Sequence, residues 1–447
     1  MSSVMPLTWV SRFVETIRVF RRRLLAALSW NIVFAVALQG STLISTILVA
    51  RILGLEAFGA YSVLVSTVMT AAAIAQSGTG VVATKFVAES AASDPGRVGR
   101  VLDLCRAFAF GMGVCVAALL FGLAELLSVH LLGRPELVEL VRTVAIAAFF
   151  QMAVSYQIGA LQGFGAFREL GLASVGVGLW NVATTAAGAA LGGLSGALVG
   201  FVAASALRSV TLGLTLGMVR RRHGIPRPSA HLARHEIRRI WTFALPTGLA
   251  GMISLPCQWL VTVLLARMQD GLVLVALFAV ANQVRLAVLQ IPSMLNAVSF
   301  SVLSRLIGER QGKGFREVFW SNFAMTSLFS ILAVGVLLLA AGPVLSLYGP
   351  SFAAAQGVLV VLLLSAIPEM LGMSLYQLVQ TSGRMWHSLF LIAMPRDYLY
   401  LGASALLMPE LGAMGAAYAY LMAQILALVS TGVVAQWCAS HAVPRPL

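Results

Sequence analysis

Charged residues are scarce in this chain. Only 10% of its 447 residues are Asp, Glu, Lys or Arg, whereas about a quarter of the residues in an ordinary soluble domain are charged. Hydrophobic residues make up 59% of the sequence, and the mean hydropathy is +0.91. Because so few charged residues cannot cover that much apolar surface, the composition excludes a soluble globular protein. It predicts an all-α polytopic membrane protein.

Acidic residues and paired cysteines are also in short supply. The chain has 16 Asp and Glu against 30 Lys and Arg, and the net charge of +14 would suggest a nucleic-acid partner in a soluble protein. In a membrane protein the same excess is explained by basic cytoplasmic loops, so no nucleic-acid partner is expected. The four cysteines form no CxxC pair, and no P-loop motif occurs. We therefore expect no disulfide framework, no metal site and no cofactor.

Long apolar runs recur from Leu24 to Trp437, each sufficient to cross about 30 Å of hydrocarbon as a helix. Turn residues or charges, such as "GRPE" at 133–136 and "YGPS" at 348–351, separate these runs. The pattern predicts about twelve transmembrane helices, at 24–50, 59–84, 101–129, 137–161, 170–190, 194–219, 240–266, 271–300, 317–341, 352–382, 386–408 and 411–437.

Twelve helices place both termini on the same side of the membrane. If that side is the cytoplasm, most of the 30 Lys and Arg lie in cytoplasmic segments, as the positive-inside rule requires. We therefore expect a multi-pass protein of the bacterial cytoplasmic (inner) membrane with both termini cytoplasmic. The predicted divisions are a basic N-terminus at 1–23, an N-lobe at 24–219, a basic cytoplasmic linker at 220–239, a C-lobe at 240–438 and a cytoplasmic tail at 439–447.

The two halves resemble each other. The run "TILVAR" at 46–51 ends in Arg51, and "TVLLAR" at 262–267 ends in Arg267; at nearly the same offset, Tyr156-Gln157 aligns with Tyr376-Gln377. Since each half has an even number of helices, the halves form two homologous lobes of one orientation, and a substrate site is expected between them. Arg51 and Arg267 are either anchors at the outer headgroups or parts of an outer gate.

Three blocks carry a family resemblance: "VARILGLEAFGAYS", "LQGFGAFRELGL" and "FALPTGLAGMISLPCQWLVTVLLAR". They resemble the oligosaccharide (O-antigen and exopolysaccharide) flippases of the multidrug/oligosaccharidyl-lipid/polysaccharide exporter superfamily. The resemblance implies a V-shaped, MATE-like pair of six-helix lobes that work by alternating access. It also implies transfer of a polyprenyl-pyrophosphate-linked glycan from the inner to the outer leaflet. The expected partners are that glycan, membrane lipids, and polysaccharide polymerase and export machinery.

Polar residues inside the predicted spans are candidate substrate-binding residues, because charge within a bilayer normally faces a cavity or a partner. Arg285 lies deep in the eighth span, on one stripe with Asn282, and its planar fork suits a pyrophosphate; the family resemblance places this span on the central cleft. Arg208 is the equivalent candidate in the first half, and Asn31 and Gln39 share a face that could bind sugars. Interhelical hydrogen bonding is the alternative role for each of them.

A second charged cluster lies in spans ten and eleven. Glu369 follows Pro368, and Arg396 and Asp397 follow Pro395, at similar depths from the predicted cytoplasmic end. Glu369 and Arg396 are therefore predicted to form an intramembrane pair, leaving Asp397 over. This cluster is either a structural ion pair or a site that couples transport to protons or cations.

Two other functions remain open. A cation-coupled multidrug exporter of the same superfamily would be expected to carry an acidic residue in its first-lobe helices, and spans one and two have none. A membrane-embedded glycan polymerase or glycosyltransferase would need catalytic groups on a sizeable external loop, whereas the predicted external connections are short. A two-fold repeat also suits transport better than one-sided chemistry, so we expect no enzyme.

Overall fold

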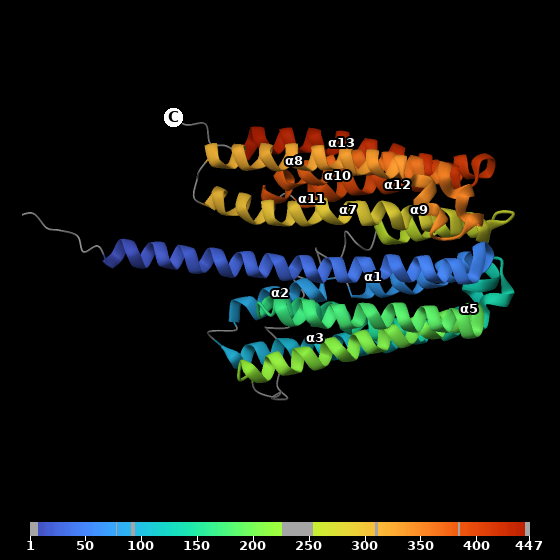
Figure 1. The fold of residues 1–447 in the computed structure, drawn as a ribbon, viewed down its shortest axis with the longest axis horizontal. Coiled ribbons are helices and arrows are strands. Elements are labelled where there is room, and N and C mark those ends of the chain that lie inside the picture. The colour runs from blue at the N-terminus through green and yellow to red at the C-terminus, as the bar shows by residue number, and fades with distance from the viewer. Residues whose placement is uncertain are drawn as a thin grey trace, which may run out of the picture.

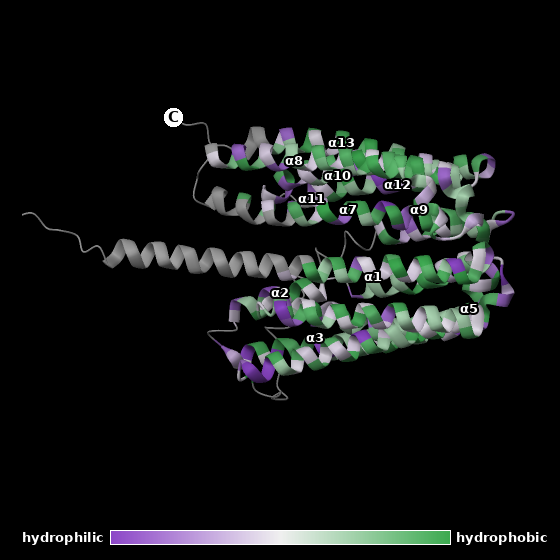
Figure 2. Ribbon diagram, viewed as in Figure 1, coloured by the Kyte–Doolittle hydropathy of each residue, from purple (hydrophilic) through white to green (hydrophobic). Residues whose placement is uncertain are grey.

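The structure, a computed structural model, describes residues 8–76, 78–90, 94–225, 254–308, 312–382 and 385–442. All regular structure in these ranges is helical, as the composition predicted (Figure 1). Hydrophobic residues predominate along the helices (Figure 2), and many large hydrophobic side chains are exposed. Leu191 and Leu339, for example, are each 89% exposed, which suits a surface in contact with lipid rather than water.

The first half of the chain forms one helical lobe. It contains α1 (Thr8–Ala75), α2 (Thr79–Ser90), α3 (Pro95–Gly122), α4 (Val138–Gly163) and α5 (Phe167–Arg222), with the short π-helix η1 (Leu126–Leu131) and the 3₁₀ turn η2 (Pro135–Leu137) before α4. Two of these helices are broken by glycine: α1 at Gly54, with φ of 75°, and α5 at Gly192 and Gly193, the latter with φ of 57°. Only glycine adopts such left-handed backbone readily, so each break divides a long helix into two membrane spans.

The second half forms the other lobe. It contains the helical segment Ser254–Ala266, then α7 (Gly271–Gly308), α8 (Gly312–Leu339), α9 (Ala341–Ser346), η3 (Pro350–Ala355), α10 (Gln356–Thr381), α11 (Met385–Ser388), the π-helix η4 (Leu389–Ala393), α12 (Met394–Leu411) and α13 (Ala413–Ala442). Because α11, η4 and α12 follow one another without interruption, they make a single span.

The predicted number of spans is confirmed. Eight helices of the described ranges are long and apolar enough to cross a membrane, and two of them hold the glycine breaks. The α11–α12 span and the segment Ser254–Ala266 account for the rest. The start of the seventh span and most of the predicted linker 220–239 fall in 226–253, outside the described residues.

The two lobes lie side by side and meet at one end (Figure 1). The start of α1 and the end of α13 lie at the opposite end, which the charge pattern predicts to be cytoplasmic (Figure 1). At the predicted outer end one hydrophobic core runs through both lobes; we call it the outer seam, formed by Val49, Ala50, Phe58, Gly59 and Ala60 of α1 and by Leu272, Val275, Ala276 and Phe352 of the second lobe.

The outer seam depends on one close approach. A methyl group on Gly59 would overlap the backbone carbonyl of Leu272, so α1 and α7 pack with no side chain between them. Phe58 then meets Phe352 edge to face, with 5.9 Å between ring centroids. Deeper in the protein, Trp259 Nε1 donates to Thr67 Oγ1 across the lobes at 2.9 Å. These contacts hold the outer ends of the two lobes together.

Candidate functional site

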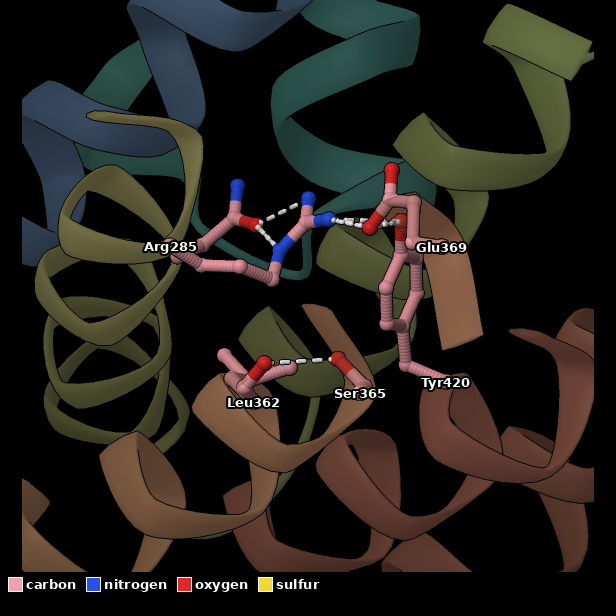
Figure 3. Close-up of polar contacts among 6 residues, drawn as sticks. Arg285, Leu362, Ser365, Glu369 and Tyr420 are labelled. Atoms are coloured by element: carbon pink, nitrogen blue, oxygen red, sulfur yellow. Dashed lines mark hydrogen bonds and ion pairs between the residues drawn. The ribbon is translucent and has the colours of Figure 1, made fainter. Parts of the chain in front are cut away.

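A buried polar network joins three helices of the C-lobe (Figure 3). Arg285 of α7 donates through Nη1 to Glu369 of α10 and, at 2.8 Å, to Tyr420 Oη of α13. The Tyr420 hydroxyl donates to the same carboxylate at 3.1 Å. Arg285 also donates from Nε and Nη2 to Asn282 Oδ1, at 3.0 and 2.7 Å. The guanidinium lies 4.4 Å from the Tyr420 ring centroid, which adds a cation–π contact.

This network leaves Arg285 little capacity for another ligand. All three of its side-chain nitrogens donate to groups of the C-lobe, and its side chain is only 6% exposed. The Asn282 amide holds the guanidinium by a bond three residues back on the same helix. The geometry therefore favours the interhelical role for Arg285 and Asn282 over direct contact with substrate.

The predicted pair between Glu369 and Arg396 is wrong. Glu369 pairs with Arg285. Arg396 instead donates from Nε and Nη2 to the two carboxylate oxygens of its neighbour Asp397, at 2.8 and 3.1 Å. Ser254 donates to Asp397 and accepts from Arg396 at 3.3 Å, so Asp397 is not left over. Counting residues along a span does not give the helix face on which each group lies. A π-helical turn, here η4 just before Arg396, rotates all later side chains relative to an ideal α-helix.

Glu369 and Arg396 nevertheless line one cavity of about 440 Å³ in the C-lobe. Its polar wall includes Gln424 and Thr431 of α13, and its apolar wall includes Trp386 of α11. Both charged residues are already paired with other groups. The cavity therefore presents a charge-neutral, hydrogen-bonding interior rather than an anion site.

A second cavity, of about 610 Å³, lies in the N-lobe among α1, α2, α4 and α5, and Arg208 and Lys85 line it. It exists where α2 and α4 touch: a methyl group on Gly159 would overlap the backbone of Gly80, and Thr84 Oγ1 donates to the Gly159 carbonyl at 3.0 Å. Polar side chains surround the two basic groups, from Gln76, Thr84, Gln151, Ser155 and Gln162.

Arg208 differs from Arg285 in being unpaired. It is half-buried on α5 and has no hydrogen bond or ion pair with any residue that the structure describes. No Asp or Glu lines the cavity. A half-buried guanidinium without a counter-charge is costly unless an anion or water reaches it. Arg208 is thus the candidate of the sequence analysis whose surroundings best suit an anionic ligand.

The structure gives less information about the two remaining candidates, Gln39 and Asn31. Gln39 is half-buried on α1, and the side chain of Asn31 lies outside the described part of the chain. Sequence reasoning missed Tyr420, because a lone tyrosine in an apolar span carries no signal of its partners. Lys85, too, carries no local signal of a binding site in the sequence. The position of Lys85 beside Arg208 follows from the contact of α2 with α4, which no local pattern reveals.

The twin arginines are not equivalent in space. Arg51 is exposed beside the break in α1. Arg267 reaches across to the N-lobe and donates to the carbonyls of His130 and Leu131 at the end of η1, the latter through Nε at 2.7 Å. Carbonyls at a helix end lack intrahelical partners and carry partial negative charge. Arg267 therefore links the two lobes by hydrogen bonds beside the outer seam.

Replacing Arg267 with alanine should loosen the outer seam. Charged hydrogen bonds of this kind contribute about 1.5 kcal/mol or more, which corresponds to about tenfold in a two-state equilibrium. Ala276 is fully buried in the seam, so Ala276→Cys, introduced into a variant without the four native cysteines, reports opening of the seam. With Arg267→Ala added, this cysteine should react with an external, membrane-impermeant maleimide about tenfold faster than it does when Arg267 is present. Arg51→Ala removes the same charge but no hydrogen bond between the lobes, so it is the matched control. Equal labelling rates in the two variants would show that the hydrogen bonds of Arg267 do not stabilise the closed seam.

Comparison with known proteins agrees with this architecture. The sequence profile of the family described as "Polysaccharide biosynthesis protein" matches residues 24–307. The EPS I polysaccharide export inner membrane protein EpsE of Ralstonia nicotianae is 28% identical over 197 residues, which are 42% of this chain and 45% of that protein. The match thus spans less than half the length of that relative.

Solved structures share the fold over nearly the whole chain. An inward-facing multidrug resistance MATE family transporter of the MOP superfamily superposes with a TM-score of 0.76 at 19% identity, over 92% of this chain and 96% of that one. An outward-facing structure described in the same terms gives 0.66 at 19% identity, over 91% and 95%. The two-lobe MATE-like fold is confirmed. Since the family profile covers more than half of the sequence, this chain belongs to the polysaccharide biosynthesis protein family.

Proposed function

We propose that this protein is a flippase that moves a polyprenyl-pyrophosphate-linked oligosaccharide from the inner to the outer leaflet by alternating access. Family membership supports a role in polysaccharide biosynthesis, and the export function named for EpsE supports transport. The closed outer seam, together with the better fit to the inward-facing MATE structure, supports a state that receives substrate from the cytoplasmic side.

The observation that carries the proposal is the unpaired Arg208 in the basic N-lobe cavity. A pyrophosphate presents several oxygens to the donors of a guanidinium, and Lys85 adds a second positive charge on the same cavity. The uncharged amide and hydroxyl groups around them, such as Gln151 and Ser155, suit sugar hydroxyls. In this proposal the polyprenyl tail stays in the lipid while the charged head and glycan cross between the lobes.

The same cavity argues against the competing functions. A cationic drug would be repelled by Arg208, because no acid lines the cavity to offset its charge. Catalysis of glycan transfer or polymerisation would require acid–base or nucleophilic groups beside a glycan site, and the cavity of Arg208 offers amides and hydroxyls instead. We accordingly propose a transporter and not an enzyme, set in the bacterial inner membrane with both termini and the linker 220–239 in the cytoplasm.

Arg208→Ala should lower translocation at least about tenfold while the protein stays normally abundant, because a charged hydrogen bond to substrate is lost but no protein partner is orphaned. Arg208→Lys should retain part of the activity, since the charge survives without the bidentate fork. The assay is the arrival of a fluorescent polyprenyl-pyrophosphate oligosaccharide at the outer face of proteoliposomes. Arg221→Ala, an exposed arginine at the end of α5, is the matched control. Full translocation by Arg208→Ala would contradict the proposal.

A further inference from the structure

A third cavity, of about 400 Å³, lies on a different part of the N-lobe, among α3, α4 and α5. None of the residues that line it also lines the cavity of Arg208. Parts of its rim face the surroundings of the lobe: Val210 is 52% exposed and Leu214 66% exposed. The cavity therefore opens to the lipid.

The lining of this cavity changes from polar to apolar along the membrane normal. Its polar residues lie toward the helix ends on the side of the chain termini: Asp103 and Arg106 of α3, Tyr156 and Gln157 of α4, and Arg220 of α5. Its bulky apolar residues lie deeper: Phe110, Phe149, Phe150, Val210 and Leu214. With Arg106 eleven residues into α3, the polar part reaches about 17 Å from the helix end at a rise of about 1.5 Å per residue.

Charge and hydrogen bonding at the polar end are incomplete. Asp103 pairs with Arg220 at 3.1 Å. Arg106 lies 5.7 Å from the Phe110 ring centroid in a cation–π contact and interacts electrostatically with Tyr156, while the acid nearest to it in sequence, Asp103, forms its ion pair with Arg220 instead. Gln157 is buried and donates from Nε2 to the Ser209 carbonyl at 3.1 Å, but its Oε1 has no partner. A buried acceptor left in this way needs a donor from outside the protein.

We propose that this cavity binds one anionic glycerophospholipid of the leaflet on the side of the chain termini. Arg106 would donate to the phosphodiester, Gln157 Oε1 would accept from a hydroxyl of a glycerol headgroup, and the first methylenes of an acyl chain would lie against Phe110 and Phe149. A polar headgroup and an apolar chain match the two ends of the cavity in the order in which the bilayer presents them. The inference does not depend on the proposed glycan substrate, because it concerns a separate cavity.

The test is lipid binding by the purified full-length protein, counted by native mass spectrometry during titration with phosphatidylglycerol. Wild type should retain one phosphatidylglycerol more tightly than phosphatidylcholine. Arg106→Ala should weaken that one binding event about tenfold, since a charge-assisted hydrogen bond is lost. Arg221→Ala removes a neighbouring exposed arginine that does not line the cavity and should bind normally.

A second variant fills the cavity without removing charge. Gly217 lines it, and a Cβ there would meet no atom within 4 Å, so Gly217→Leu fits the fold but occupies the space of the lipid. It should abolish the tight binding event. Gly176→Leu, at another open position on the same helix, is its control. The proposal is overturned if Gly217→Leu retains phosphatidylglycerol like wild type, or if a polyprenyl monophosphate at equal concentration displaces phosphatidylglycerol from wild type.

Discussion

Gly59→Ala should abolish export by preventing the outer seam from closing. In the closed seam the added methyl group would overlap the carbonyl of Leu272, and neither backbone can retreat without separating α1 from α7. Alanine is otherwise the better helix former, by about 1 kcal/mol, so loss of function cannot come from a weakened helix. External labelling of Ala276→Cys should rise beyond the tenfold expected for Arg267→Ala.

Gly40→Ala is the matched control for that experiment. Gly40 lies on the same helix, and a methyl group there would have no atom within 4 Å. It should leave both export and the protection of the seam unchanged. If Gly59→Ala keeps Ala276→Cys protected, the approach of α1 to α7 is not what closes the outer end.

Arg285→Met should sharply reduce the amount of folded protein in the membrane. It removes the cation that compensates Glu369 and, among the described residues, leaves that carboxylate with only the Tyr420 hydroxyl as a partner. Breaking a buried ion pair from one side destabilises a protein by about 3–5 kcal/mol. Arg142→Met, which breaks the exposed pair with Glu139, should cost less than about 1 kcal/mol and is the control.

The double variant Arg285→Met with Glu369→Gln separates structure from function. Because the buried negative charge is removed as well, most of the folded protein should return. Abundance is measured by fluorescence-detected size exclusion, and stability by the midpoint of thermal unfolding. Normal abundance of the single Arg285→Met variant would contradict the interhelical role and return Arg285 to the list of substrate ligands.

The sequence predicted the features that depend on local pattern. Hydropathy and turn residues marked the twelve spans, and the gaps between predicted spans at 51–58 and 191–193 contain the glycines at which α1 and α5 divide, because a helix end needs only local backbone freedom and polarity. The similarity of "TILVAR" to "TVLLAR" correctly indicated two lobes. These predictions hold because each membrane-spanning segment must satisfy its backbone hydrogen bonds internally, and a helix does so in every span.

The sequence could not predict which charged side chains of different helices pair with one another. Glu369, Arg285 and Arg396 have similar depths, and only the rotation of each helix decides which two meet. That rotation depends on distant packing and on the π-helical turn η4, which leaves no mark in composition. Arg51 and Arg267 likewise occupy equivalent sequence positions, but among the described residues only Arg267 donates to carbonyls of the other lobe, at the end of η1.

The outer seam also bears on the electrical insulation of the cell. Its side chains, such as Val49, Phe58, Val275 and Phe352, are apolar and buried, so they offer no hydrogen bonds to support a continuous file of water. Protons move through membranes along such files, and each one that leaks releases about 2.3 kcal/mol per 100 mV of membrane potential. In the proposed flippase, an outer end closed by such side chains would let the protein wait for its glycan substrate without discharging the membrane.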